Sequence, residues 1–182
     1  MKKIALLALF ASFVQAANAQ IYMGKQTTTH FLSKSDIEDI EAKNTLAKIA
    51  INTKTGQVQV KVPNKGFKFK SSFMEEHFNE NYMETEKYPV SAFDGKINEK
   101  IDYSKDGEHK VTCTGKLDMH GVTQEVTIPG TLKIKGSEIT LDANFKVKIA
   151  DYKIKVPSLY VKNIAEEIGI DMNAVLEPFK KP

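Results

Sequence analysis

The sequence of 182 residues contains no arginine, and every basic side chain apart from the four histidines is a lysine. Arginine makes the bidentate contacts with phosphate and guanine that nucleic-acid-binding proteins favour, so its absence argues against nucleic acid as a partner. Cysteine is almost as scarce, since Cys113 is the single one and lies on the apolar side of a predicted strand, where cysteine behaves as a small hydrophobe. One cysteine cannot form an internal disulfide, so the fold depends on its hydrophobic core.

Long hydrophobic runs are also missing, apart from a short one at the beginning of the chain. Two lysines precede an almost wholly apolar run over residues 4–14, and Ala17-Asn18-Ala19 then supplies small residues around a cleavage position. This is the pattern of a secretory signal peptide, and the run is too short for the alternative, a membrane-spanning anchor. We therefore expect residues 1–19 to be removed, which lowers the net charge from +3 to +1. Residues 20–182 are then expected to form one periplasmic or secreted domain with no transmembrane segment.

From Ile21 onward, apolar and polar residues mostly alternate, which is the period of a half-buried β-strand. In the clearest case, valines at every second position over residues 58–62 follow an apolar run over residues 46–51, and a glycine turn between them predicts a hairpin. Further alternating runs cover residues 92–97, 111–117, 126–134 and 145–149, with interruptions expected at Gly115 and at Pro129-Gly130. Short strands with tight turns predict an antiparallel sheet that curls into a sandwich or barrel. The interior of a barrel of about eight strands is either filled by side chains or holds one small ligand.

Two segments depart from the strand period and predict short amphipathic helices. Residues 71–83 carry three large apolar side chains four residues apart, which places them on one helical face. Residues 158–168 show a similar spacing, and Gly169 follows at a position suited to a helix C-cap.

Metal sites and covalent catalytic motifs are not apparent in the sequence. The four histidines lie too far apart for a local metal motif, and no nucleophile elbow is present, so we expect neither a metal site nor an enzyme. His120 precedes Gly121 at the end of a strand, which favours a structural turn residue and alternatively allows a contact to a ligand head group. Three carboxylates lie close together in sequence, at Asp36, Glu38 and Glu41. They either surround the opening of a site or lie on an exposed strand face, and the exposed face is the commoner arrangement.

Large apolar side chains gather between residues 67 and 93. Phe67 and Phe69 precede the predicted helix at residues 71–83, several members lie on it, and Tyr88 and Phe93 follow it. A helix rich in phenylalanine and methionine near a barrel mouth can form an adaptable lid over an apolar ligand. The same residues can instead be the core that fills the barrel, and composition alone favours this second interpretation.

A set of separate motifs occurs in order along the chain. The motifs are Ile40-Glu41-Ala42-Lys43-Asn44, Thr55-Gly56, the run from Met74 to Met83, Glu86-Lys87-Tyr88-Pro89, Phe93-Asp94-Gly95-Lys96-Ile97, the run from Gly115 to Thr123, Asp151-Tyr152-Lys153-Ile154 and Pro157. In this order and spacing they resemble the YceI-like family over essentially all of residues 20–182. The resemblance implies a mainly β fold: an antiparallel, eight-stranded, lipocalin-like barrel with one or two short helices near its mouth.

The resemblance also implies a long apolar pocket for a chain amphiphile such as a polyisoprenoid, an isoprenoid quinone or a fatty-acid derivative, with no cofactor besides such a lipid. It reverses the interpretation of the aromatic cluster from core to pocket lining. The ligand-binding residues expected on this basis are Phe67, Phe69, Phe73, Met74, His77, Phe78, Tyr82, Met83, Tyr88, Phe93, His120 and Tyr152. Because the chain has no arginine to hold a phosphate, a neutral or carboxylate-headed lipid is favoured over a polyprenyl phosphate.

Two other functions stay open at this point. One is a cell-envelope interaction protein whose barrel is filled and which acts through its surface. The other is an enzyme acting on the lipid, with His120 or His77 as acid or base. A barrel that leaves a gap between strands can also dimerise along it, so a homodimer is among the expected assemblies.

Overall fold

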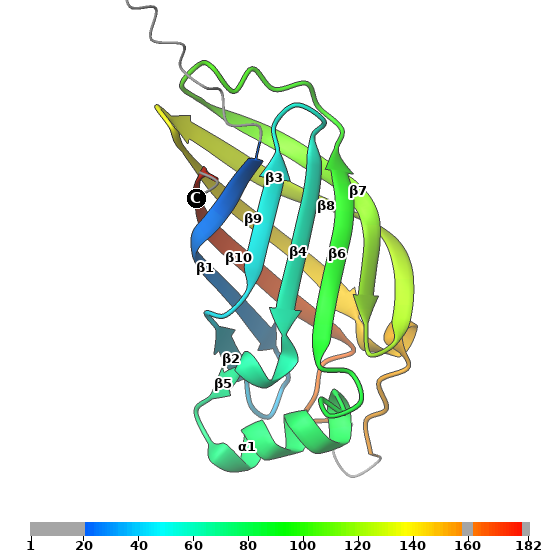
Figure 1. Cartoon of the computed structure of the whole chain (residues 1–182). Coiled ribbons are helices and arrows are strands. Elements are labelled where there is room, and N and C mark those ends of the chain that lie inside the picture. Colours follow the sequence, from blue (N-terminus) through cyan, green and yellow to red (C-terminus); the bar gives the residue numbers. More distant parts are fainter. Residues whose placement is uncertain (1–20, 158–161, 180–182) are drawn as a thin grey trace, which may run out of the picture.

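The computed structural model describes residues 21–157 and 162–179, so the predicted signal peptide lies outside the described residues. Strands dominate the chain, and one helix lies across one end of the sheet (Figure 1). The strands are β1 (Ile21–Ser33), β2 (Ile40–Asn44), β3 (Lys48–Asn52), β4 (Gln57–Pro63), β5 (Lys68–Phe69), β6 (Val90–Ile97), β7 (Gly107–Met119), β8 (Val122–Lys135), β9 (Glu138–Lys148) and β10 (Glu167–Pro178). The helical segments are α1 (Ser72–His77), which continues as a π-helical turn (Phe78–Tyr82), and 3-10 turns at Asn64–Gly66 and Ile149–Tyr152.

Within the described residues, eight strands close into an antiparallel barrel in the order β1-β3-β4-β6-β7-β8-β9-β10. The ring is completed by β10 pairing with β1 from Tyr22–Pro178 to Leu32–Gly169. On its other edge β1 is shared, because its first residues pair with β3 and its last five, Thr29–Ser33, pair with β2. The short strand β5 adds to β2 as a side branch. The predicted eight-stranded lipocalin-like barrel is confirmed.

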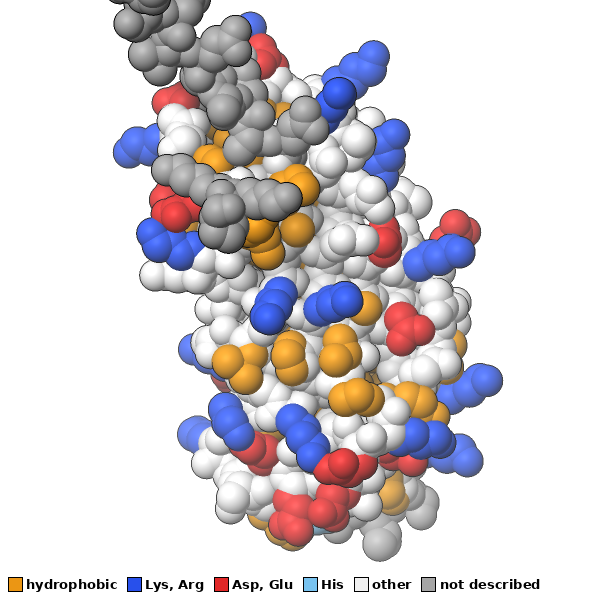
Figure 2. Space-filling model, viewed as in Figure 1, with side chains coloured by type: hydrophobic (Ala, Val, Ile, Leu, Met, Phe, Trp, Pro, Cys, Tyr) orange, Lys and Arg blue, Asp and Glu red, His pale blue; other side chains and the backbone are white. Residues whose placement is uncertain are grey.

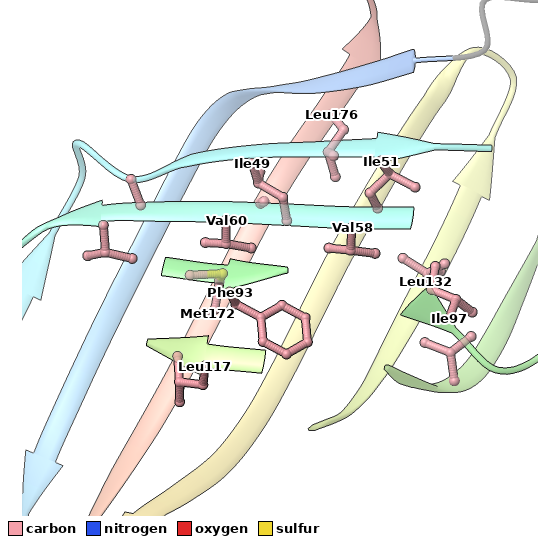
Figure 3. Packing of buried hydrophobic residues seen from close by; sticks show 14 of the residues in the cluster. Ile49, Ile51, Val58, Val60, Phe93, Ile97, Leu117, Leu132, Met172 and Leu176 are labelled. Atoms are coloured by element: carbon pink, nitrogen blue, oxygen red, sulfur yellow. The ribbon is translucent and has the colours of Figure 1, made fainter. Parts of the chain in front are cut away.

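The alternating pattern of each strand turns one set of side chains into the barrel. Along β4 the three valines are buried and the residues between them are exposed, as predicted from their period of two. Figure 3 shows side chains from β3 and β4 meeting those of the opposite wall. The side chains with almost no exposed surface include Ile49, Ile51, Leu132, Ile139 and Leu176. This packed cluster fills one part of the interior and leaves the rest to the cavity described below.

The turn between β7 and β8 is a two-residue hairpin formed by His120 and Gly121. Both residues have positive φ, 53° and 71°. A tight hairpin turn that matches the strand twist requires this conformation at both central positions, and histidine is among the residues that adopt it more readily. The predicted turn at this position is thus present.

The helix predicted at residues 71–83 is present as α1 and its π-helical continuation. The helix predicted at residues 158–168 is wrong over its described part: residues 162–166 form turns, and β10 begins at Glu167. Gly169 lies inside that strand and not at a helix C-cap. The apolar residues at positions 168, 170 and 172 follow the period of two. All three pair with β9, and those at 170 and 172 also pair with β1, which decides their conformation.

Both predicted strand interruptions are also wrong. β7 runs through Gly115, which pairs directly with Gly95 of β6. β8 runs through Pro129, which lies where pairing with β9 has just ended, since that pairing covers only Gly130–Lys135 on β8. A proline is tolerated there because the ladder on that edge needs no N–H from it.

Candidate ligand-binding site

The barrel encloses a cavity of about 420 Å³. Its lining comes from inward side chains of the barrel strands and from α1 with its π-helical turn, and it is overwhelmingly apolar. Along β7 the lining runs from Val111 to Met119. At about 3.3 Å per residue, this makes the cavity roughly 20 Å long after allowing for strand tilt. Volume, shape and lining are those of a site for a single chain-like apolar molecule.

Four phenylalanine rings gather where the helix meets the barrel. Phe78 of the π-helical turn stacks on Phe31 of β1, with ring centroids 5.6 Å apart. Phe67 and Phe69, from the segment that precedes α1, lie edge-on or tilted against the same two rings at 5.0 to 5.6 Å. Offset and edge-to-face contacts of this kind are favourable beyond the area they bury. The cluster therefore joins the helix to the barrel wall at one end of the cavity, and we call it the aromatic gate.

The helix is tied down at both ends by polar contacts. At its start, the Lys68 ammonium donates to the Glu75 carboxylate, and this hydrogen bond lowers the pKa of Glu75 below its usual value. At its end, the Asn79 carbonyl accepts from the Thr85 backbone N–H at 2.8 Å, and the buried Thr85 hydroxyl donates to the Asn79 side chain at 3.1 Å. Acidic side chains gather on the surface at this end of the molecule (Figure 2). The helix is thus a fixed cover held by specific contacts.

Nine of the twelve residues predicted to bind ligand line this cavity. They are Phe67, Phe69, Phe73, Met74, His77, Phe78, Tyr82, Met83 and Phe93. Phe73 is largely exposed, at 62 %, and lies against the His77 ring with centroids 4.1 Å apart, so it forms the outer lip. The other three, Tyr88, His120 and Tyr152, are not part of the lining and come together elsewhere.

His120 is the centre of that second cluster. Its Nε2 lies 2.9 Å from a Glu84 carboxylate oxygen, and its Nδ1 lies 3.0 Å from the Tyr152 backbone carbonyl. The carboxylate and the carbonyl both offer acceptor oxygens, so a ring nitrogen that carries a proton can donate to the oxygen it faces. The Tyr88 ring packs on the imidazole with centroids 4.6 Å apart.

Backbone strain gathers at the same cluster. Among the described residues, those other than glycine with positive φ are Glu84, His120 and Lys153, which lie in or next to it. Such conformations cost energy and persist where surrounding contacts enforce them. Gly121 is also required here, because a Cβ atom on it would lie 2.5 Å from the Tyr88 ring. The cluster joins the loop after the helix to the β7–β8 turn and to the 3-10 turn before residue 153; ligand contact by Tyr88, His120 and Tyr152 stays a prediction.

The cavity wall contains a few polar side chains that the sequence reasoning passed over. The Ser33 hydroxyl accepts from the Ala165 backbone N–H at 2.9 Å, and Asn64 donates to the Tyr88 carbonyl at 2.7 Å and accepts from Ser91 at 2.9 Å. Thr29 differs, because its buried hydroxyl has no hydrogen-bond partner among the described residues. Its position on the inward side of β1 was the only available signal. Glu38, left open above, lies at the rim of the cavity.

Cys113 lines the cavity, and we expect its thiol to be nearly inert in the folded protein. Burial, followed by the nearby carboxylates of Glu99 and Asp94, raises the pKa of the Cys113 thiol to about 11. Below that pH the group stays protonated, and only the thiolate reacts. At pH 8, alkylation by iodoacetamide should be about a hundredfold slower than in the urea-unfolded chain, where the thiol has its ordinary pKa. Mass spectrometry of timed samples measures both rates, and equal rates would contradict this environment for the thiol.

Within residues 21–157 and 162–179, no three side chains of the histidine, cysteine, aspartate and glutamate types are placed to hold a metal ion together. Within the same ranges, no helix has the length and apolar character needed to cross a membrane.

Comparison with known proteins places the chain in a family. The profile of the YceI-like domain matches residues 14–176. No curated protein matches the chain. The solved structures that resemble it include a polyisoprenoid-binding domain from Saccharophagus degradans implicated in plant cell wall breakdown, with a TM-score of 0.74 at 14 % identity over 88 % of this chain and 99 % of that one. BcnA from Burkholderia cenocepacia gives a TM-score of 0.69 at 19 % identity, over 82 % of this chain and 95 % of that one.

The YceI protein of Campylobacter jejuni also shares the fold, with a TM-score of 0.59 at 16 % identity over 99 % of this chain and 100 % of that one. At these identities the structural likeness concerns the fold, and the family match rests on the sequence profile, which covers most of the chain. The profile, the closed eight-stranded barrel and the motifs read from the sequence agree: the chain belongs to the YceI-like family.

Proposed function

We propose that this protein binds one chain-like amphiphile, such as a polyisoprenoid, an isoprenoid quinone or a fatty-acid derivative, inside the barrel. The observation that carries the proposal is the apolar cavity of about 420 Å³ with the aromatic gate at one end. Each methylene group transferred from water into such a cavity contributes about 0.8 kcal/mol, so a dozen of them give useful affinity without any charged contact. The polyisoprenoid-binding domain of Saccharophagus degradans, which has the same fold, supports this ligand class.

The proposal extends to the role of the protein as a carrier. The signal peptide predicted at residues 1–19 would deliver it to the periplasm or the medium, where a long apolar molecule needs a protein to cross water. Sequestration in the barrel fits this task, because the apolar lining shields the bound chain from water. We propose binding without chemical conversion of the lipid, and without a metal or organic cofactor.

The test is to purify the protein gently from its host, record its native mass, and identify what organic solvent extracts from it. We expect a discrete extra mass of lipid size. Ala143 lines the cavity from β9, so Ala143→Phe should fill the space and remove this mass. The matched control is Ala50→Phe, which places the same side chain on the outward side of β3 and should leave the lipid in place.

A different outcome would overturn the proposal. If the protein has only its own mass, and the mass stays unchanged after incubation with quinones, polyprenols and fatty acids, the cavity does not bind lipids. The surface of the barrel would then be the place to look for function. If Ala143→Phe keeps the extra mass, the lipid is bound somewhere other than the cavity.

A further inference from the structure

The inner wall of β1 carries a polar group that the fold itself does not use. Thr29 lines the cavity and is 3 % exposed, and its hydroxyl lacks a hydrogen-bond partner among the described residues. A buried hydroxyl without a partner costs free energy, so such a group calls for a partner from elsewhere. The other cavity hydroxyls described above, Ser33 and Ser91, are already bonded to the protein.

The position of Thr29 fixes where such a partner would lie. Phe31 follows it at the next inward position on the same strand and belongs to the aromatic gate. Thr29 pairs across the sheet with Met172, which also lines the cavity. The hydroxyl is therefore one inward position behind the gate, and a polar atom bonded to it would be enclosed with the chain, not left in the solvent.

The charges around the cavity restrict that atom further. None of the described lining residues is a lysine, and the one carboxylate among them, Glu38, lies at the rim. The one basic group among the described lining residues is the His77 imidazole at the outer lip, so an anionic head group behind the gate would meet no permanent cation and would pass the Glu38 carboxylate at the rim. Burying an unpaired anion is far more costly than burying a hydroxyl or carbonyl that has one hydrogen bond.

We infer that the ligand is an uncharged, oxygen-bearing chain lipid, and that Thr29 is the residue which recognises its hydroxyl or carbonyl oxygen behind the aromatic gate. This inference rests on the proposed function and makes its ligand class specific. A long-chain alcohol, ketone or quinone has a head group of this kind, whereas a lipid phosphate does not. One hydrogen bond of this type corresponds to about tenfold in affinity.

The experiment compares three ligands of equal chain length, namely dodecan-1-ol, dodecane and dodecyl phosphate. Each displaces the fluorescent probe N-phenyl-1-naphthylamine from the protein, which gives a dissociation constant. Thr29→Val should weaken the binding of dodecanol about tenfold and leave that of dodecane unchanged, because it replaces the hydroxyl by a methyl group of similar size. Thr29→Ser should keep the affinity of the wild type for dodecanol. In the wild type, dodecyl phosphate should bind more weakly than dodecanol.

Thr27→Val is the matched control. Thr27 is buried on the same face of the same strand, two residues away, but does not line the cavity. It should therefore leave all three dissociation constants unchanged. Thermal melts of each variant show whether it folds, and Thr29→Val should melt no lower than the wild type without ligand, because it removes a buried hydroxyl that has no partner.

The outcomes separate this inference from the proposed function. If neither the probe nor any of the three ligands binds the wild type, the proposed function fails. If the ligands bind but Thr29→Val changes dodecanol and dodecane equally, or changes neither, the assignment of Thr29 is wrong. If dodecyl phosphate binds the wild type most tightly, the ligand is not an uncharged lipid.

Discussion

Gly115→Ala is expected to destabilise the protein by about 3 kcal/mol or more, which is the upper range for overpacking a well-packed position. A Cβ atom on Gly115 would lie 2.3 Å from the Asp94 carbonyl oxygen and 2.3 Å from the Cα atom of Gly95. Both contacts are with the backbone of β6, which cannot rotate away as a side chain can. The two paired strands would have to separate, and the barrel wall would open.

Chemical denaturation followed by circular dichroism measures this effect. Gly169→Ala is the control, because it adds the same methyl group within a strand of the same barrel. Among the described residues, the one atom that a Cβ added to Gly169 would meet within 4 Å is the Leu32 carbonyl oxygen, at 3.7 Å, so the control should keep or slightly raise stability through its effect on the unfolded chain. If both variants unfold at the same denaturant concentration, the close strand contact at Gly115 is not present in solution.

Phe78→Ala is expected to speed ligand release by about a hundredfold while lowering the melting temperature only moderately. Phe78 contacts three other rings of the aromatic gate, and each aromatic pair contributes about 1 kcal/mol beyond its buried area. Losing these contacts would remove the attachment of the helix to the barrel at the gate. Because Phe78 is only half-buried, its loss should cost less stability than that of a core phenylalanine.

Stopped-flow dilution of the loaded protein into lipid vesicles measures the release rate, and a thermal melt of the unloaded protein measures stability. Phe73→Ala is the matched control on the same helix, since Phe73 is largely exposed and lies against His77 at the outer lip. It should change release little. Unchanged release from Phe78→Ala together with a large fall in melting temperature would identify Phe78 as part of the core and not of the gate.

The barrel itself could be predicted from the sequence because alternation is a local signal. The spacing of the valines of β4 and the turn at Gly56 predict a hairpin. The structure contains this hairpin, formed by β3 and β4. The helix predicted at residues 158–168 is wrong because a helical spacing of apolar residues is a weak signal over so short a segment. In its described part, residues 162–166 form turns, and Glu167 and Ile168 already pair with β9 as the start of β10.

Some residues of the candidate site could also be predicted from a local pattern, and others could not. Phenylalanine and methionine near the predicted helix pointed to the cavity, because large apolar side chains on an amphipathic helix must face something apolar. The contact of Glu84 with His120 could not be predicted from a local pattern. The two residues are 36 positions apart, and both have a left-handed backbone conformation. Thr29 had only its inward position on β1 as a signal. What distinguishes it is a hydroxyl without a partner among the described residues, and this depends on the complete three-dimensional arrangement.

The closure of the barrel has a consequence for the order in which the molecule can be made. The ring is completed only when β10, the last of the described strands, pairs with β1, the first of them, from Tyr22–Pro178 inward. Until the C-terminal strand has left the ribosome, the nascent chain can form hairpins, but its inward apolar faces stay open to water. Contacts so distant in sequence form late, because a long loop must close before they are gained. The cavity is thus complete only once β10 has been made, and a nascent chain that stops before β10 cannot enclose a lipid.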